Sequence, residues 1–187
     1  LAIAVERDKG HVSVRRTCIH GTPDMAEADY RYVERYVKFL LWSIGGFRVY
    51  ICGNDPIAAR LAKDYAVDGA RAFDFDFFHK LYKRDLEVIA LPLDKCPEPN
   101  EAPVPIGGHM DGCRIGFDAG GSDRKVSAVI DGKCVYSEEV VWHPKTQADP
   151  TYHYNEIVEA FRTAASKMPR VDAIGVSSAG TFIGNAP

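Results

Sequence analysis

A cluster of prolines near the middle of the chain divides the sequence into two halves. Five of the eleven prolines lie within residues 92–105. Proline has a fixed φ angle and no backbone N–H to donate to a strand ladder, so a segment this rich in proline favours an extended connector over a strand or a helix. We therefore expect a first unit over residues 1–91, a connector over 92–110 and a second unit over 111–187.

In the first half, strand patterns alternate with helix patterns. Apolar residues recur at helical spacing from Thr22 until the Gly45-Gly46 pair, where a helix is expected to end. A turn at Asp8-Lys9-Gly10 separates two β-rich runs, which predicts a hairpin. In chain order we expect strands over residues 2–7 and 11–19, a helix over about 23–44, a strand over 47–52, a helix over 55–67 and a strand over 86–91. The aromatic segment 72–84 favours neither helix nor strand.

The second half also combines strands with a helix. Residues 113–118, 125–130 and 133–141 have strand character, and Asp131-Gly132 is typical of the hairpin turn between the last two. A helix is expected over about 154–167, followed by a strand over 171–176. Both halves therefore predict an α/β fold.

Composition excludes several classes of protein. Of the 187 residues, 46% are hydrophobic and 26% are charged, which is typical of folded soluble proteins. The net charge of −3 indicates no basic surface, so we expect neither nucleic acid nor a membrane as a partner. The longest apolar run, Phe39 to Phe47, is far shorter than the roughly 20 residues that span a bilayer.

Cysteine usage predicts the compartment. The five cysteines form no C-x-x-C pair, which predicts reduced thiols rather than disulfides or a zinc site. No charged-then-apolar leader follows Leu1, so we expect a cytoplasmic protein. Because the sequence begins without methionine and stops just after a predicted strand, we expect it to be part of a longer chain. The sequence leaves homo-oligomerisation open.

The most informative motif is a glycine-rich turn between two predicted strands. Asp118 ends the first strand, Gly120, Gly121 and Ser122 follow, and Lys125 opens the second strand. Adjacent glycines allow a tight turn and leave backbone N–H groups open to an anion, while a serine hydroxyl and a lysine add donors. An aspartate beside such a turn suits a hydrated Mg²⁺. The pattern predicts a phosphate site, and a plain β-hairpin turn is the alternative.

Asp118, Gly120, Gly121 and Ser122 resemble the first phosphate motif of the superfamily of sugar kinases, heat-shock ATPases and actin. The resemblance is closest to the ROK family (repressors, open reading frames, sugar kinases). The later segment 171–180 is similar to that family's strand and Gly-rich loop beside the sugar pocket. Ser178, Gly180 and Thr181 stand at the matching places of this substrate loop. The resemblance covers about residues 113–187.

The resemblance implies a ribonuclease H-like (actin-like ATPase) lobe that begins in residues 111–187, with residues 1–91 as an additional α/β unit. It implies an ATP-dependent sugar kinase whose cofactors are Mg²⁺ and ATP and whose partners are a nucleotide and a small sugar. Asp118 would hold Mg²⁺ through water, and Gly120, Gly121 and Ser122 would hold phosphate. The family's general base belongs to a later segment with an Asn-Asp pair that these residues do not contain, so we expect this chain alone to be inactive.

The chain also departs from the family pattern. Asp123 and Arg124 stand where a basic and an apolar residue are usual, which predicts weaker phosphate binding. Two other functions therefore remain open. One is a non-catalytic sensor of a sugar or nucleotide, and the other is an ATPase that drives a conformational change in a partner.

Overall fold

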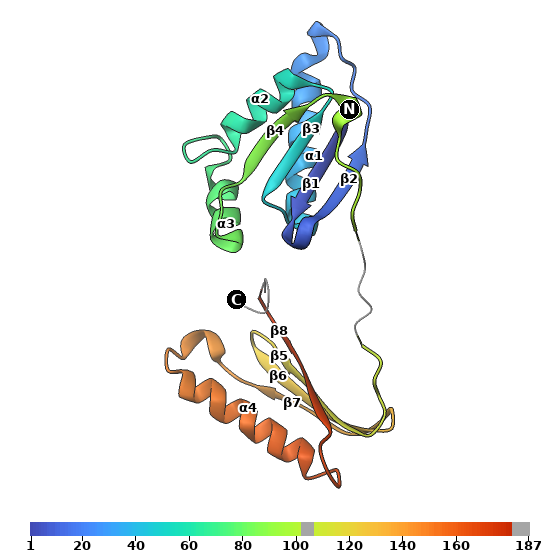
Figure 1. Cartoon of the computed structure of the whole chain (residues 1–187). Coiled ribbons are helices and arrows are strands. Elements are labelled where there is room, and N and C mark those ends of the chain that lie inside the picture. Colours follow the sequence, from blue (N-terminus) through green and yellow to red (C-terminus); the bar gives the residue numbers. More distant parts are fainter. Residues whose placement is uncertain (102–106, 181–187) are drawn as a thin grey trace. The chain divides into compact units, whose positions relative to one another are not determined.

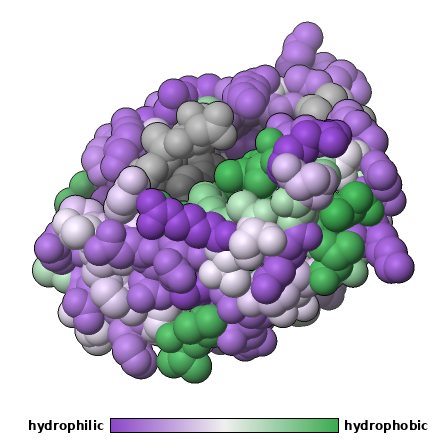
Figure 2. All heavy atoms as spheres, turned by 90° about the horizontal axis from the view of Figure 1, so that it is seen from below, coloured by the Kyte–Doolittle hydropathy of each residue, from purple (hydrophilic) through white to green (hydrophobic). Residues whose placement is uncertain are grey.

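The computed structural model describes residues 1–101 and 107–180, which form two units (Figure 1). Each unit contains a mixed sheet of four strands with helices packed on it. The predicted α/β class is therefore confirmed. In residues 1–101 and 107–180, none of the helices combines the length and apolar character needed to cross a membrane. The surface seen in Figure 2 is largely hydrophilic, with apolar residues in separate small groups.

The N-terminal unit has the strand order β2-β1-β3-β4. Its elements are β1 (Ala2–Arg7), β2 (His11–Arg16), α1 (Ala26–Ile44), β3 (Arg48–Cys52), α2 (Asp55–Asp64), α3 (Ala72–Tyr82) and β4 (Glu87–Leu91). Strand β1 is antiparallel to both β2 and β3, whereas β3 and β4 are parallel. The predicted hairpin, helices and strands of this half are thus confirmed, with ends that differ by a few residues.

The core of this unit lies between one face of the sheet and two helices. Alternate residues of β1 and β3 point to that face, as expected for strands with one buried side. The residues that pack there are Ile3, Val5, Val49 and Ile51 from the strands, Val33, Val37 and Leu41 from α1, and Ile57 and Leu61 from α2. The Asn54 side chain caps α2 by accepting a hydrogen bond from the Ile57 amide at 3.0 Å.

The ambiguous aromatic segment is helix α3. Phe78 is buried in the core, while Phe73 and Phe77 remain exposed beside Trp42 of α1. Asp74 is also buried, and it accepts hydrogen bonds from Lys38 Nζ at 2.9 Å and from Trp42 Nε1 at 2.6 Å. The helical pattern is weak in the sequence because a buried carboxylate takes a position where an apolar side chain is usual.

The first part of the predicted connector packs on the N-terminal unit. Residues 92–101 run from the end of β4 to the outer edge of β2, where Val12 and Asn100 exchange backbone hydrogen bonds of 3.0 and 2.9 Å. The Asn100 side chain also donates to the Gly10 carbonyl at 2.8 Å. This contact covers part of a free strand edge. Residues 102–106 of the connector lie outside the described residues.

The C-terminal unit has the strand order β7-β6-β5-β8. Its elements are β5 (Cys113–Ala119), β6 (Asp123–Ile130), β7 (Lys133–Val141), α4 (Pro150–Ala165) and β8 (Ala173–Ser178). Strands β5, β6 and β7 form an antiparallel meander, and β8 returns beside β5 in the parallel direction. Helix α4 begins before the expected residue 154, because Pro150 suits a first helical turn and Asp149 accepts from the Thr151 amide at 2.9 Å.

Helix α4 covers one face of the second sheet (Figure 1). Ile115, Phe117, Val126 and Ala128 point from β5 and β6 toward α4, whose Ala160 and Ala164 are fully buried. Small side chains at these helix positions let α4 lie close to the sheet. Because side chains alternate along a strand, the residues between these apolar positions point to the opposite face.

Candidate functional site

The predicted phosphate motif lies at the hairpin that joins β5 to β6. Strand β5 ends at Ala119 and β6 begins at Asp123, so the glycine pair and Ser122 form the turn itself. Asp118 and Lys125 are directly opposite each other in the strand register. The hairpin thus brings together all five residues that the sequence predicted for phosphate binding.

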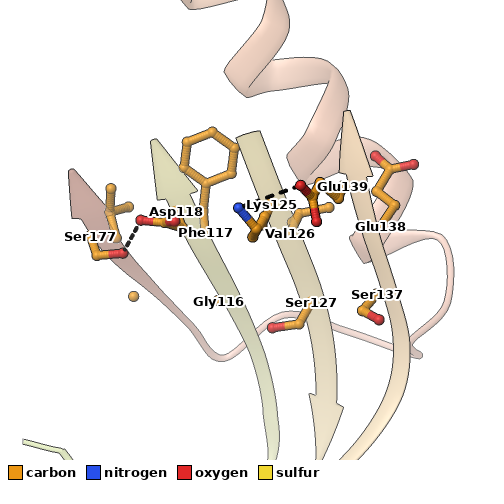
Figure 3. A pocket seen from close by; sticks show the side chains of 12 residues that line it. Gly116, Phe117, Asp118, Lys125, Val126, Ser127, Ser137, Glu138, Glu139 and Ser177 are labelled. Carbon is orange, nitrogen blue, oxygen red and sulfur yellow. Dashed lines mark hydrogen bonds and ion pairs between the residues drawn. The ribbon is translucent and has the colours of Figure 1, made fainter. Parts of the chain in front are cut away.

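The face of the sheet away from α4 carries the candidate site (Figure 3). An open depression of about 690 Å³ lies along this face. Its lining residues come from all four strands and include Gly116 and Asp118 of β5, Lys125 and Ser127 of β6, Glu139 of β7 and Ser177 of β8. The arrangement places polar and charged groups on a face that α4 leaves open.

Ser177 is a site residue that the sequence did not predict. Its hydroxyl donates a hydrogen bond of 2.7 Å to Asp118 Oδ1, as Figure 3 shows. The two residues are register partners in the parallel strands β5 and β8. The strand predicted over residues 171–176 stops before Ser177, and the pairing of β8 with β5 depends on sheet register, so no local signal pointed to this pair. Ser177 thus bonds to one carboxylate oxygen of Asp118 and not to the other, Oδ2.

The predicted substrate loop is only partly placed at this face. Ser178 follows Ser177 in β8, so its side chain points to the opposite side of the sheet. Its hydroxyl donates to the Ala179 carbonyl at 3.3 Å. Gly180 has a φ of 131°, which favours glycine at this bend. Thr181 lies outside the described residues.

Trp142 holds the glycine turn in place. Its indole Nε1 donates to the Gly120 carbonyl at 2.9 Å, and its backbone amide donates to the Ser122 carbonyl at 3.1 Å. The indole ring is buried and packs edge-on against Phe117. Two of the three carbonyl groups of the turn, those of Gly120 and Ser122, are therefore engaged by the protein.

The amide groups of the turn make no hydrogen bond with the part of the chain that the structure describes. Within residues 1–101 and 107–180, the N–H groups of Gly120, Gly121 and Ser122 donate to no protein atom. A Cβ atom at Gly120 would lie 2.5 Å from the Asp123 carbonyl oxygen, so only glycine fits there. When the carbonyl groups of a turn accept hydrogen bonds and its amide groups donate none, the turn favours the binding of an anion.

Asp123 opposes this local positive character. It accepts a hydrogen bond from Ser122 Oγ at 2.8 Å and forms an ion pair with Lys125. Lys125 and, to a smaller extent, Ser122 hold the pKa of the Asp123 carboxyl below its usual value. In turn, Asp123 raises the pKa of the Lys125 ammonium, which also lies 3.7 Å from Glu139. Two of the predicted phosphate ligands are thus engaged by a carboxylate.

Replacing Asp123 by asparagine is expected to strengthen the binding of a phosphate ligand up to about fivefold. The change removes one negative charge from an exposed turn and frees the charge of Lys125. Titration calorimetry with ATP would measure the gain. Asp131→Asn is the matched control, because it also removes one negative charge but lies in the hairpin at the other end of β6. Equal affinity in the wild-type and Asp123→Asn proteins would contradict the expected role of Asp123.

Arg124 does not belong to the candidate site. Its side chain points toward α4, where it is buried and bonds with Glu156 at 2.8 Å and with Glu138 at 3.5 Å. Arg124 therefore joins β6, β7 and α4. The predicted effect of Arg124 on phosphate affinity has no direct contact to support it.

A hydrated magnesium ion is compatible with the donor set at this face. No group of three or more His, Cys, Asp or Glu side chains in the described part of the chain could enclose a metal ion. Mg²⁺ keeps several of its waters and is commonly bound by one or two carboxylates together with the phosphates of its ligand. Asp118 offers one such carboxylate, oriented by Ser177.

No known family model matches this chain, and no curated protein is significantly similar to it. The functional argument therefore rests on the geometry of the β5–β6 turn and of the open sheet face.

Proposed function

We propose that the C-terminal unit opens a nucleotide-binding lobe of ribonuclease H-like (actin-like ATPase) type, and that the protein belongs to an ATP-dependent sugar kinase of ROK type. The strand order supports this proposal. An antiparallel meander, a helix and a parallel strand beside the first one are the elements with which such a lobe begins. In this arrangement the phosphate turn joins the first two strands, as the turn between β5 and β6 does.

The observation that carries the proposal is the glycine turn with free amides next to Asp118. In a phosphoryl transfer from Mg-ATP to a sugar hydroxyl, fixed donors stabilise the negative charge of the transferring group. The amides of Gly120, Gly121 and Ser122 would supply such donors, and Lys125 would add positive charge once it is released from Asp123. Mg²⁺, when bound, neutralises phosphate charge, and Asp118 would hold it through water.

The sugar side of the reaction is less complete in this chain. Gly180 and Thr181 would belong to the substrate loop at the end of β8, and Ser178 would act there only through its backbone. The general base that accepts the proton of the sugar hydroxyl has no counterpart in residues 1–187 by resemblance. We therefore assign nucleotide binding to this chain and turnover to a protein that also carries the base. We place the activity in the cytoplasm, where thiols stay reduced.

ADP release by the complete gene product, measured with Mg-ATP and a panel of hexoses, amino sugars and N-acetyl sugars, tests the proposal. Release that depends on one sugar would support the kinase and name its substrate. Failure to bind ATP would overturn the assignment of the turn.

The engagement of Ser122 and Lys125 by Asp123 favours a second candidate, a sensor that binds a sugar or nucleotide without turnover. ATP binding without ADP release for any sugar would point to this sensor and contradict the kinase. ADP release in the absence of sugar would instead point to an ATPase that drives a partner.

A further inference from the structure

Lys145 lies directly over the glycine turn. A Cβ atom at Gly121 would be 3.2 Å from Lys145 Cε and 3.3 Å from Lys145 Nζ. The ammonium group is therefore close to Gly121, although Lys145 and Gly121 are 24 positions apart in the sequence. Glycine at this position leaves the space that the lysine side chain crosses.

The segment that carries Lys145 is held on both sides. Lys145 is the middle residue of a short 3₁₀ turn, Pro144–Thr146, which follows β7. His153 of α4 contacts the Pro144 carbonyl oxygen at 3.2 Å, and Thr146 Oγ1 donates to the His143 carbonyl at 3.1 Å. Together with Trp142, which bonds to the glycine turn, these contacts position the Lys145 backbone relative to Gly121.

The charge of Lys145 is available, unlike that of Lys125. Lys125 is paired with Asp123 and lies near Glu139. Lys145 is exposed and takes part in no ion pair among residues 1–101 and 107–180. An unpaired ammonium beside free backbone amides is a favourable place for a phosphate group.

We infer that Lys145 is a phosphate-binding residue of the glycine turn. It supplies positive charge there because the charge of Lys125 is neutralised by its ion pair with Asp123. The ligand class is a polyphosphate, as in the phosphate chain of a nucleoside triphosphate. One phosphate group would lie between Lys145 Nζ and the amides of Gly120, Gly121 and Ser122. This inference rests on the proposed function, since it assigns a further ligand to the same site.

The test is titration calorimetry of the chain with sodium tripolyphosphate and with ATP, both without Mg²⁺ so that Asp118 and a metal do not contribute. Lys145→Met is expected to weaken the binding of both ligands by about tenfold to a hundredfold, because a hydrogen bond between charged groups is lost. Lys145→Arg keeps the charge and is expected to retain most of the affinity. Lys133→Met is the matched control, because Lys133 is exposed at the far end of β7, beside the Asp131-Gly132 turn.

A second variant tests the geometry without changing any charge. Gly121→Ala adds a methyl group 3.2 Å from Lys145 Cε and 3.3 Å from Lys145 Nζ, so the end of the lysine side chain must shift by a few tenths of an ångström. We expect weaker tripolyphosphate binding in this variant too, with the Lys145→Met and Gly121→Ala effects less than additive.

The outcomes separate the two hypotheses. If the wild-type chain binds neither tripolyphosphate nor ATP, the proposed function fails and the role of Lys145 fails with it. If the wild-type chain binds both and Lys145→Met binds them equally well, the role of Lys145 is overturned while the proposed function stands. If Lys145→Met and Lys133→Met weaken binding equally, the effect is one of net charge, and the specific role of Lys145 is also overturned.

Discussion

Replacing Asp118 by asparagine is expected to abolish the contribution of Mg²⁺ to ATP binding, a loss of about tenfold to a hundredfold in affinity. The reason is that the amide of asparagine cannot balance the charge of a hydrated cation, whereas a carboxylate can. The fold should persist, because asparagine Oδ1 can still accept the hydrogen bond of Ser177. Calorimetric titrations with ATP, in the presence of Mg²⁺ and in the presence of a chelator, would measure the effect.

Asp131→Asn is the matched control for this experiment. Asp131 lies in the hairpin at the other end of β6 and has a φ of 47°, a conformation that asparagine also adopts readily. This variant should bind Mg-ATP as the wild type does. If Asp118→Asn kept the full advantage of Mg-ATP over ATP, the metal-binding role of Asp118 would be refuted, whereas the role of the turn amides would not.

Replacing Trp142 by alanine is expected to lower the free energy of unfolding of the C-terminal unit by about 3–5 kcal/mol, as for other buried tryptophans. The change removes a buried ring that packs between Phe117 and His153. It also removes the indole donor that holds the Gly120 carbonyl. Hydrogen exchange of the β5 and β6 amides would measure this loss, and the amides of the N-terminal unit serve as an internal reference.

Trp142→Phe separates packing from hydrogen bonding. The phenyl ring fills most of the space but cannot donate to Gly120, so we expect a smaller loss of about 1 kcal/mol. We also expect both variants to weaken ATP binding, since the Gly120 carbonyl loses its indole donor, whereas the backbone amide of residue 142 still holds the Ser122 carbonyl. Unchanged exchange and unchanged ATP affinity in Trp142→Ala would show that the turn keeps its conformation without this residue.

Asp123 brings a negative charge and Lys145 a positive charge to the glycine turn, so the two charges oppose each other there. Asp123 accepts from Ser122 and pairs with Lys125, while the Lys145 ammonium lies close to Gly121 and forms no ion pair within residues 1–101 and 107–180. The expected gain in Asp123→Asn and the expected loss in Lys145→Met therefore have opposite signs. Measured together, these two variants show how much each of the two charges changes the affinity of the turn for phosphate.

Most of the secondary structure could be predicted because its signals are local. The helical spacing before Gly45 and the Asp131-Gly132 turn depend on neighbours within a few residues, and the structure confirms both of them. Segment 72–84 was ambiguous, because helix α3 depends on a carboxylate that is buried only when Lys38 and Trp42 of α1 lie beside it. Likewise, residues 92–101 show no strand pattern, and the Asn100 contact depends on β2, far back in the chain.

The sequence by itself determined the α/β class, the order of all strands and helices except α3, and the glycine turn with Asp118, because alternation, helical spacing and turn residues act between close neighbours. Only the tertiary structure decided which groups meet at that turn. Ser177 reaches Asp118 through the parallel pairing of β5 and β8, Trp142 holds Gly120, and Lys145 crosses over Gly121. These contacts join segments that are more than 20 residues apart. Their partners are set by sheet register and by the packing of α4, which no local pattern encodes.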